Sequence, residues 1–369
     1  MKNTETRTFA CIDLAAARHN YNAVKGCVAD KVKIMPVIKA NAYGHGASRL
    51  ARLYAEMGAH ALCVACIAEA LELRQSGITL PILILGPTHP QHADTLCDND
   101  ITQTVHSLCY AEALCDSLTQ KKRLKVHVKL DTGMRRIGFT SDDAPERLLG
   151  MKKLEVCGIF THFAESDTLT SGFTDSQLEK YTSMLKRFEG QPLLRHTANS
   201  AACMCHSDTH FDAVRPGIIL YGSYPSHQVK EQYEKAHEPL LPVMSFRSRI
   251  THIFDVKKGE SIGYSRTFYA PRDMKIATLC AGYGDGVPRL LSNRGRIGVG
   301  GRMYNIVGNV CMDQLMIDVS DGDVSLYDEA VIFGAGGDSC DVAADICNTI
   351  SYELYCGITS RVPRIYIGE

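Results

Sequence analysis

The sequence predicts an α/β protein with an N-terminal (β/α)8 barrel of the TIM type, residues 1–238, and a C-terminal, mostly antiparallel β-domain, residues 239–369. Short apolar runs alternate with helix-like stretches in the first part, which is typical of parallel strands joined by helices. Polar residues follow these runs, at the strand ends where barrel enzymes have their active sites. After Pro239, apolar and polar residues alternate over short, glycine-rich runs, which is typical of antiparallel strands.

The barrel prediction depends on a series of buried strands. Most are short and mainly apolar, as expected when both faces of a sheet are covered. The runs are 34–38, 61–65, 81–85, 101–105, 124–130, 156–160, 193–195 and 213–215. Apolar residues at helical spacing predict helices between them, at 14–24, 47–57, 68–75, 110–118, 145–151 and 176–188. Eight such units close into a barrel.

The C-terminal part has a different pattern. Alternation predicts strands at 276–279, 296–299, 315–319 and 330–333, and one helix is expected at 342–350. A charged stretch with prolines around 235–240 is the expected linker, because domain boundaries fall in such segments.

The composition excludes several classes of protein. A net charge of −1 with 45% hydrophobic residues indicates a globular protein that binds neither nucleic acid nor a membrane surface. No apolar run approaches the ~18 residues of a membrane span, and the first residues contain no signal core. The 15 cysteines are scattered and odd in number, so we expect free thiols and a cytoplasmic location. No group of ligand residues predicts a metal site.

Lys39, directly after the first apolar run, is the first candidate for chemistry. Burying a lysine is costly, and position alone favours a surface lysine whose stem lies on apolar groups. The ends of later runs add further polar residues: Tyr43, Lys129, Arg136, His162, Asn199, Ser200 and Arg215. This basic, hydroxyl-rich set suggests an anionic cofactor or substrate, and no carboxylate pair suits glycoside chemistry.

A phosphate site is predicted beside these residues. Gly217 and Ile218 can open a helical turn behind Pro216. Their amides and the Ser200 hydroxyl would form the phosphate site that barrels build after strands seven and eight. A lysine opposite such a site is the arrangement of a pyridoxal phosphate enzyme or of a Schiff-base aldolase.

The segment PVIKANAYGHG resembles the cofactor-lysine motif of bacterial alanine racemases, pyridoxal 5'-phosphate enzymes built from a barrel and a β-domain. The resemblance extends over nearly the whole chain. The other matching segments, in order, are VHVKLDTGMRRIGF, THFAESD, HTANSAA, VRPGIILYG, GYSRTF, AGYGDGVPR, GNVCMDQLMID, ISYE and RVPRIYIGE.

The resemblance implies a site shared by the two subunits of a homodimer. Lys39 would hold the cofactor and act as one base, and Tyr264 of the partner subunit would be the opposing base. Arg215 would face the pyridine nitrogen, with His162 as its polarising partner. The remaining cofactor contacts are expected from Tyr43, Asn199, Ser200, Gly217, Ile218 and Tyr352.

The substrate contacts are implied in the same way. Arg136 would bind the substrate carboxylate in a bidentate pair, and Met312 of the partner subunit would offer a backbone amide. Lys129 is expected to be carbamylated, because a bare ammonium would repel Arg136 by roughly 1–4 kcal/mol at ~4 Å. Taken alone, His162 and Met312 would be core residues and Arg136 a surface arginine.

The leading hypothesis is interconversion of L- and D-alanine for peptidoglycan synthesis. A serine racemase on the same scaffold is the close alternative, but the bulky Tyr352 favours a methyl side chain. A non-catalytic pyridoxal phosphate carrier would not need the β-domain with Tyr264. A decarboxylase would need an acidic group at the pyridine nitrogen, where this chain has Arg215.

Overall fold

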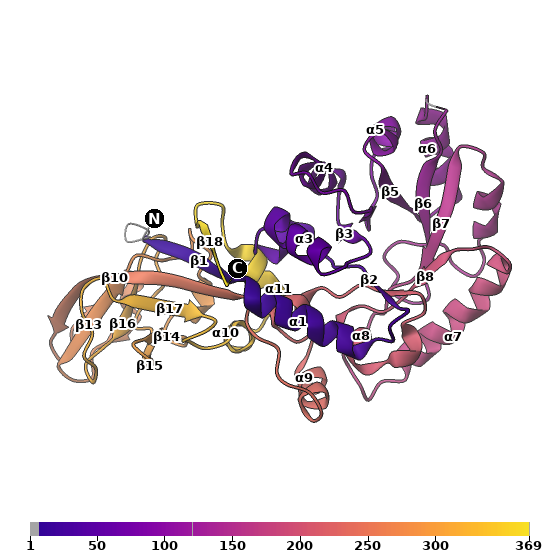
Figure 1. The fold of residues 1–369 in the computed structure, drawn as a ribbon. Coiled ribbons are helices and arrows are strands. Elements are labelled where there is room, and N and C mark those ends of the chain that lie inside the picture. The colour runs from indigo at the N-terminus through magenta and orange to yellow at the C-terminus, as the bar shows by residue number, and fades with distance from the viewer. Residues whose placement is uncertain (1–6, 120, 369) are drawn as a thin grey trace.

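The computed structural model describes residues 7–119 and 121–368, which form a barrel and a β-domain side by side (Figure 1). The barrel sheet is parallel, with strand order β2-β9-β8-β7-β6-β5-β4-β3. Its strands are β2 (Lys33–Ile34), β3 (Leu62–Val64), β4 (Ile82–Ile84), β5 (Ile101–Val105), β6 (Leu124–Lys129), β7 (Leu154–Phe160), β8 (Leu194–His196) and β9 (Ala213–Val214).

The ring closes between the extension of β2 and β3. The Ile38 amide donates to the Cys63 carbonyl at 2.9 Å, and the Cys63 amide donates to the Pro36 carbonyl at 2.8 Å. The predicted strand at 34–38 is shorter in the structure because Pro36 has no amide to give to a ladder. The predicted fold class, a TIM-type barrel followed by a β-domain, is confirmed.

Helices cover the outside of the barrel (Figure 1). Asp13 caps the first of them, accepting from the amides of Ala15 and Ala16. They are α1 (Leu14–Cys27), α3 (Ala47–Glu56), α4 (Ile67–Gln75), α5 (Ala93–Asp98), α6 (Leu108–Ser117), α7 (Phe173–Leu185), α8 (Ser200–Cys205) and α9 (His227–Glu234). The helix expected at 145–151 is a 3-10 helix, η2 (Pro145–Gly150), as is common for so short a segment. No helix in the described ranges is long and apolar enough to cross a bilayer.

The β-domain is built around one long strand, β10 (Met244–Val256), which pairs antiparallel with three others. Its further strands are β11 (Ser261–Ile262), β12 (Phe268–Tyr269), β13 (Met274–Leu279), β14 (Arg296–Val299), β15 (Arg302–Asn305), β16 (Leu315–Asp318) and β17 (Glu329–Phe333). The helix expected at 342–350 is α10 (Cys340–Ile346), which ends earlier than predicted, and a second helix, α11 (Ser351–Gly357), follows where none was predicted. Asn348 between them has a φ of 53°, and a left-handed residue ends a helix.

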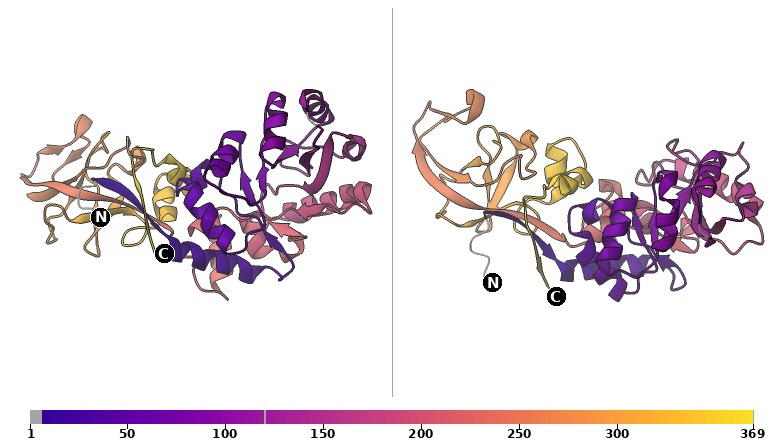
Figure 2. Two further views of the ribbon diagram at one scale, coloured as in Figure 1. Left: turned by 45° about the horizontal axis from the view of Figure 1, so that its top comes forward. Right: turned by 90° about the horizontal axis from the view of Figure 1, so that it is seen from above.

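Both ends of the chain join this domain. β1 (Thr8–Asp13) pairs antiparallel with β10 and parallel with β18 (Arg364–Ile367). β1 thus belongs to the second sheet although it precedes the barrel in the sequence, while the boundary at 238/239 stays a prediction. In both views of Figure 2 the yellow C-terminal segment lies beside the indigo start of the barrel.

The C-terminal segment contacts the loop that follows the first barrel strand. Arg364 Nε donates to the Gly44 carbonyl at 2.9 Å, and the Tyr366 hydroxyl donates to the His45 carbonyl at 3.3 Å. A Cβ at Gly46 would lie 1.8 Å from the Tyr366 hydroxyl, so only glycine allows this approach. The β-domain therefore helps to fix the mouth of the barrel.

Candidate active site

Lys39 begins a short left-handed turn, α2 (Lys39–Tyr43). Ala40, Asn41, Ala42 and Tyr43 have φ values of 51°, 54°, 53° and 51°. This conformation costs a non-glycine residue about 1–2 kcal/mol, so surrounding contacts must hold it. The His45 Nδ1–H donates to the carbonyls of Ala42 and Tyr43, at 3.0 and 2.9 Å. Such strain is common at functional sites.

The Lys39 amine is half-buried at the mouth of the barrel. Burial lowers its pKa, the charge of Arg136 lowers it further, and Glu69 opposes both effects. A lower pKa gives more of the neutral amine, which is the form that can act as a nucleophile or base.

A cluster of basic side chains surrounds Lys39. Lys129 is buried, with Nζ 5.1 Å from the centroid of the Phe160 ring. Burial and the charges of Arg215 and Arg136 lower the pKa of Lys129 to about 7. Burial and the same cations hold the pKa of His162 well below its usual value. The fold thus brings these candidates close enough to influence one another.

Arg215 is buried and hydrogen-bonded to neutral groups. Its Nη1 donates to His196 Nδ1 at 2.6 Å, and its Nη2 donates to the carbonyls of Thr161 and Thr197 at 2.8 and 3.0 Å. His162 Nδ1 lies 3.5 Å from Nη2. Burial lowers the pKa of Arg215 to about 10, so it stays charged at neutral pH. These contacts use the terminal nitrogens and leave Nε–H for another acceptor.

Hydroxyl groups and backbone amides form a second corner of the site. Ser200 Oγ accepts from the Gly217 amide at 2.8 Å. A Cβ at Gly217 would lie 2.7 Å from the Tyr43 hydroxyl, so this glycine makes room for that group. The rings of Tyr43 and Tyr352 are 5.8 Å apart. Ile218, next to Gly217, begins η5 (Ile218–Tyr221), whose first amides have no partner within the helix.

Asn199 has a supporting position behind this corner. Its Oδ1 caps α8 by accepting from the Ala202 amide at 3.0 Å, and it also accepts from Ser166 Oγ at 2.9 Å. It therefore fixes the start of the helix that carries Ser200.

Two predicted residues lie elsewhere in this chain. Tyr264 is 72% exposed and Met312 is 53% exposed, both in the β-domain. Within residues 7–119 and 121–368 their hydrogen bonds stay inside that domain: Asn309 Nδ2 donates to the Tyr264 carbonyl, and the Gly284 amide donates to the Met312 carbonyl. The chain on its own does not join them to Lys39.

The structure adds residues that the sequence did not single out. Glu69 accepts from the amides of Ala40 and Ala65, at 2.6 and 2.7 Å. His196 contacts Arg215, and His127 contacts His196. His127 precedes Lys129 by two positions on one strand, and alternation alone places both on one face.

Known proteins match this chain along nearly its entire length. The family model of the alanine racemase N-terminal domain matches residues 12–225, and that of the C-terminal domain matches residues 243–366. Alanine racemase 2 of Caldanaerobacter subterraneus subsp. tengcongensis is 45% identical over 368 residues, covering 96% of this chain and 94% of the relative. Alanine racemase of Desulforamulus reducens is 42% identical over 370 residues, covering 98% of this chain and 99% of the relative.

Solved structures of alanine racemases also superimpose on this chain. Alanine racemase of Clostridium difficile superimposes with a TM-score of 0.91 at 37% identity, covering 98% of this chain and 96% of that one. Alanine racemase of Bacillus anthracis with bound L-Ala-P superimposes with a TM-score of 0.91 at 34% identity, covering 99% of this chain and 96% of that one. The chain belongs to the alanine racemase family.

Proposed function

We propose that this enzyme interconverts L- and D-alanine, using pyridoxal 5'-phosphate held at the mouth of the barrel. The observation that best supports this is that the mouth of the barrel holds both Lys39 and Arg215. The Lys39 amine has a lowered pKa, and the terminal nitrogens of the buried Arg215 donate to neutral partners, an arrangement that leaves Nε–H for the cofactor. One group suits covalent attachment of an aldehyde, and the other suits contact with a ring nitrogen.

The residues of the site fit this cofactor at each of its three polar ends. Lys39 would hold the aldehyde carbon. The hydroxyls of Tyr43, Ser200 and Tyr352, with the amides of Gly217 and Ile218, would hold the phosphate. Arg215 would donate to the pyridine nitrogen. Asn199 supports the phosphate corner by capping α8.

The bound cofactor supplies the electron withdrawal that weakens the bond between the substrate α-carbon and its hydrogen. Arg215 keeps its own proton at neutral pH, because its pKa stays near 10. Its guanidinium would therefore leave the pyridine nitrogen unprotonated, so that the electron withdrawal supplied by the cofactor would be moderate and side reactions would be disfavoured. His162, neutral because burial lowers its pKa, accepts from Arg215 and helps to fix it.

Racemisation requires a base on each face of the α-carbon. Lys39 serves one face as a neutral amine. Tyr264 of the partner subunit serves the other face, and its exposure in the single chain supports a site completed by a second copy. Arg136 binds the substrate carboxylate, and Met312 of the partner subunit presents its amide to the substrate. The assembly is a homodimer.

The product D-alanine supplies peptidoglycan synthesis in this proposal, and the enzyme works in the cytoplasm. All 15 cysteines are free in the structure, which supports a reducing compartment.

The test is an absorbance spectrum of the purified protein, followed by an L-alanine racemisation assay with and without added pyridoxal phosphate. We expect a visible band, racemisation that needs the cofactor, and loss of both in Lys39→Ala. A Lys39→Ala protein that still forms a borohydride-reducible adduct would contradict this assignment.

A further inference from the structure

A row of polar side chains extends along the inside of the barrel below Arg215. TIM barrel interiors are normally filled by branched apolar residues, yet His127 and His196 are here and are buried. A Cβ at Gly158 would lie 2.5–2.6 Å from three atoms of the His127 ring. The glycine therefore leaves the space that this ring fills.

Arginine fixes the direction of every hydrogen bond in this row, because a guanidinium can only donate. Arg215 Nη1 is 2.6 Å from His196 Nδ1, so this nitrogen must accept. His196 Nε2 then carries the proton and donates to His127 Nδ1 at 2.8 Å. His127 in turn carries its proton on Nε2. Both rings are neutral, because burial and Arg215 lower the pKa of His127 to about 3 and that of His196 well below its usual value.

The far end of the row opens to a cavity at the opposite mouth of the barrel. The cavity has a volume of about 1420 Å³ and is lined by His127 and by residues at the starts of the strands, among them Lys33, Ile82, Lys125 and Glu155. Solvent in this open cavity can accept from His127 Nε2–H, so the row has an acceptor at each step.

We propose that His127 is a positioning residue, which acts through His196 to hold Arg215 in the orientation that leaves its Nε–H for the cofactor. The inference rests on the proposed function. Without an acceptor at His127 Nδ1, His196 Nε2–H would be buried and unpaired, which is costly. His196 would then rotate or change tautomer, and Arg215 Nη1 would lose its nearest acceptor.

Three variants test this in the holoenzyme. His127→Leu removes the acceptor at similar volume. His127→Asn puts an amide oxygen close to the position of Nδ1 and should keep an acceptor for His196 Nε2–H. Gly158→Ala keeps the histidine but forces its ring to move. Gly26→Ala is the matched control, because no atom lies within 4 Å of a Cβ there.

We expect His127→Leu and Gly158→Ala to lower kcat for alanine at least tenfold, with KM within about twofold, and to shift the visible absorbance maximum of the cofactor. His127→Asn and Gly26→Ala should match wild type in both measurements. A His127→Leu enzyme with unchanged kcat and spectrum, or a His127→Asn enzyme as impaired as His127→Leu, would overturn the inference. If His127→Leu does not fold, Gly158→Ala takes its place in the comparison with His127→Asn. An unchanged kcat and spectrum in Gly158→Ala, or equal impairment of the two variants, would then overturn the inference.

Nitrogen-15 NMR of histidine-labelled protein separates this inference from the proposed function. We expect both His127 and His196 to be neutral and protonated on Nε2, whether or not the protein racemises alanine. Protonation of either ring on Nδ1 would overturn the hydrogen-bond direction. Absence of racemisation by the wild type, with the expected tautomers present, would refute the proposed function but not this network.

Discussion

Glu69 accepts a hydrogen bond from the backbone amide of Ala40 at 2.6 Å, and its other oxygen accepts from the amide of Ala65 at 2.7 Å. One carboxylate thus ties the left-handed turn behind Lys39 to the end of the neighbouring strand. The turn is strained, so this contact is needed to hold Lys39 in place.

Glu69→Gln should therefore impair catalysis more than stability. The amide can accept through only one atom, and one backbone amide loses its partner. We expect kcat to fall about tenfold and the free energy of unfolding to fall by about 1 kcal/mol, because the site is partly exposed. Steady-state kinetics and urea unfolding measure the two effects. Glu72→Gln, on the exposed side of the same helix, is the control; equal kinetics in both variants would refute the positioning role.

Lys129 should be carbamylated in the native enzyme. Burial lowers its pKa to about 7, so much of it is the neutral amine that reacts with carbon dioxide, and the negative product would orient Arg136. Carbon-13 NMR in labelled bicarbonate should show one carbamate signal that disappears in Lys129→Ala. Lys125→Ala should keep the signal, because the hydrogen bond that Lys125 donates to Asp100 raises the pKa of Lys125 and keeps it protonated. No signal, or one lost in both variants, would contradict the prediction.

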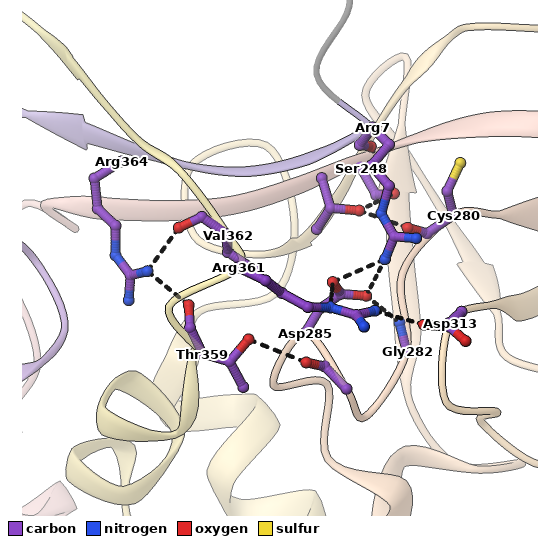
Figure 3. Close-up of polar contacts among 12 residues, drawn as sticks. Arg7, Ser248, Cys280, Gly282, Asp285, Asp313, Thr359, Arg361, Val362 and Arg364 are labelled. Atoms are coloured by element: carbon purple, nitrogen blue, oxygen red, sulfur yellow. Dashed lines mark hydrogen bonds and ion pairs between the residues drawn. The ribbon is translucent and has the colours of Figure 1, made fainter.

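Asp285 should be the main stabilising carboxylate of the β-domain (Figure 3). It accepts from Arg7 Nη2, Arg361 Nε and the Gly282 amide, at 2.7, 2.7 and 3.0 Å. Burial raises its pKa, but these bonds outweigh burial and hold the pKa below its usual value. Arg361 also donates to Asp313, the residue after Met312.

Asp285→Asn should lower the free energy of unfolding by about 2–3 kcal/mol at pH 7. A lowered folded pKa stabilises the protein above the unfolded pKa of ~3.9, and this contribution is lost as pH falls through the folded pKa. The difference from wild type should therefore shrink as pH falls below the unfolded pKa and disappear below the folded pKa, which chemical unfolding across pH would show. Asp321→Asn, at a side chain 83% exposed, is the control. If the difference in the free energy of unfolding between Asp285→Asn and wild type persists unchanged at low pH, it does not come from the charge of Asp285.

Tyr352 should limit the space for the substrate side chain, since its ring packs 5.8 Å from that of Tyr43. Tyr352→Asn removes the ring and adds an amide that can pair with a hydroxyl. We expect the ratio of kcat/KM for serine to that for alanine to rise at least tenfold, measured on both amino acids under one set of conditions. An unchanged ratio would show that this tyrosine does not set specificity.

The barrel could be predicted because several of its buried strands are short apolar runs, such as β3 and β4, that alternate with helix-like stretches. The pairing of β1 with β18 could not, because it joins the two ends of the chain, and local patterns carry no information about such distant partners. The left-handed turn at 40–43 contains no glycine, so it could not be predicted from that residue type.

The candidate site was only partly accessible from the sequence for similar reasons. Lys39, Arg215 and Ser200 lie just beyond the carboxyl ends of strands β2, β9 and β8, and the topology brings these ends together. The roles of His127 and His196 depend on the orientation of Arg215 across the barrel, which only coordinates show. The joining of Tyr264 to Lys39 depends on a second copy of the chain and stays a prediction.

The most direct test of a shared site mixes two inactive parents. Lys39→Ala and Tyr264→Phe should each be nearly inactive alone. Unfolding and remixing them in equal amounts should make about half of the dimers mixed, and each mixed dimer would contain one intact site. We predict that racemisation recovers to about a quarter of the wild-type rate. A mixture that stays as inactive as its parents, with subunit exchange verified independently, would place both bases in one chain and contradict the dimeric site.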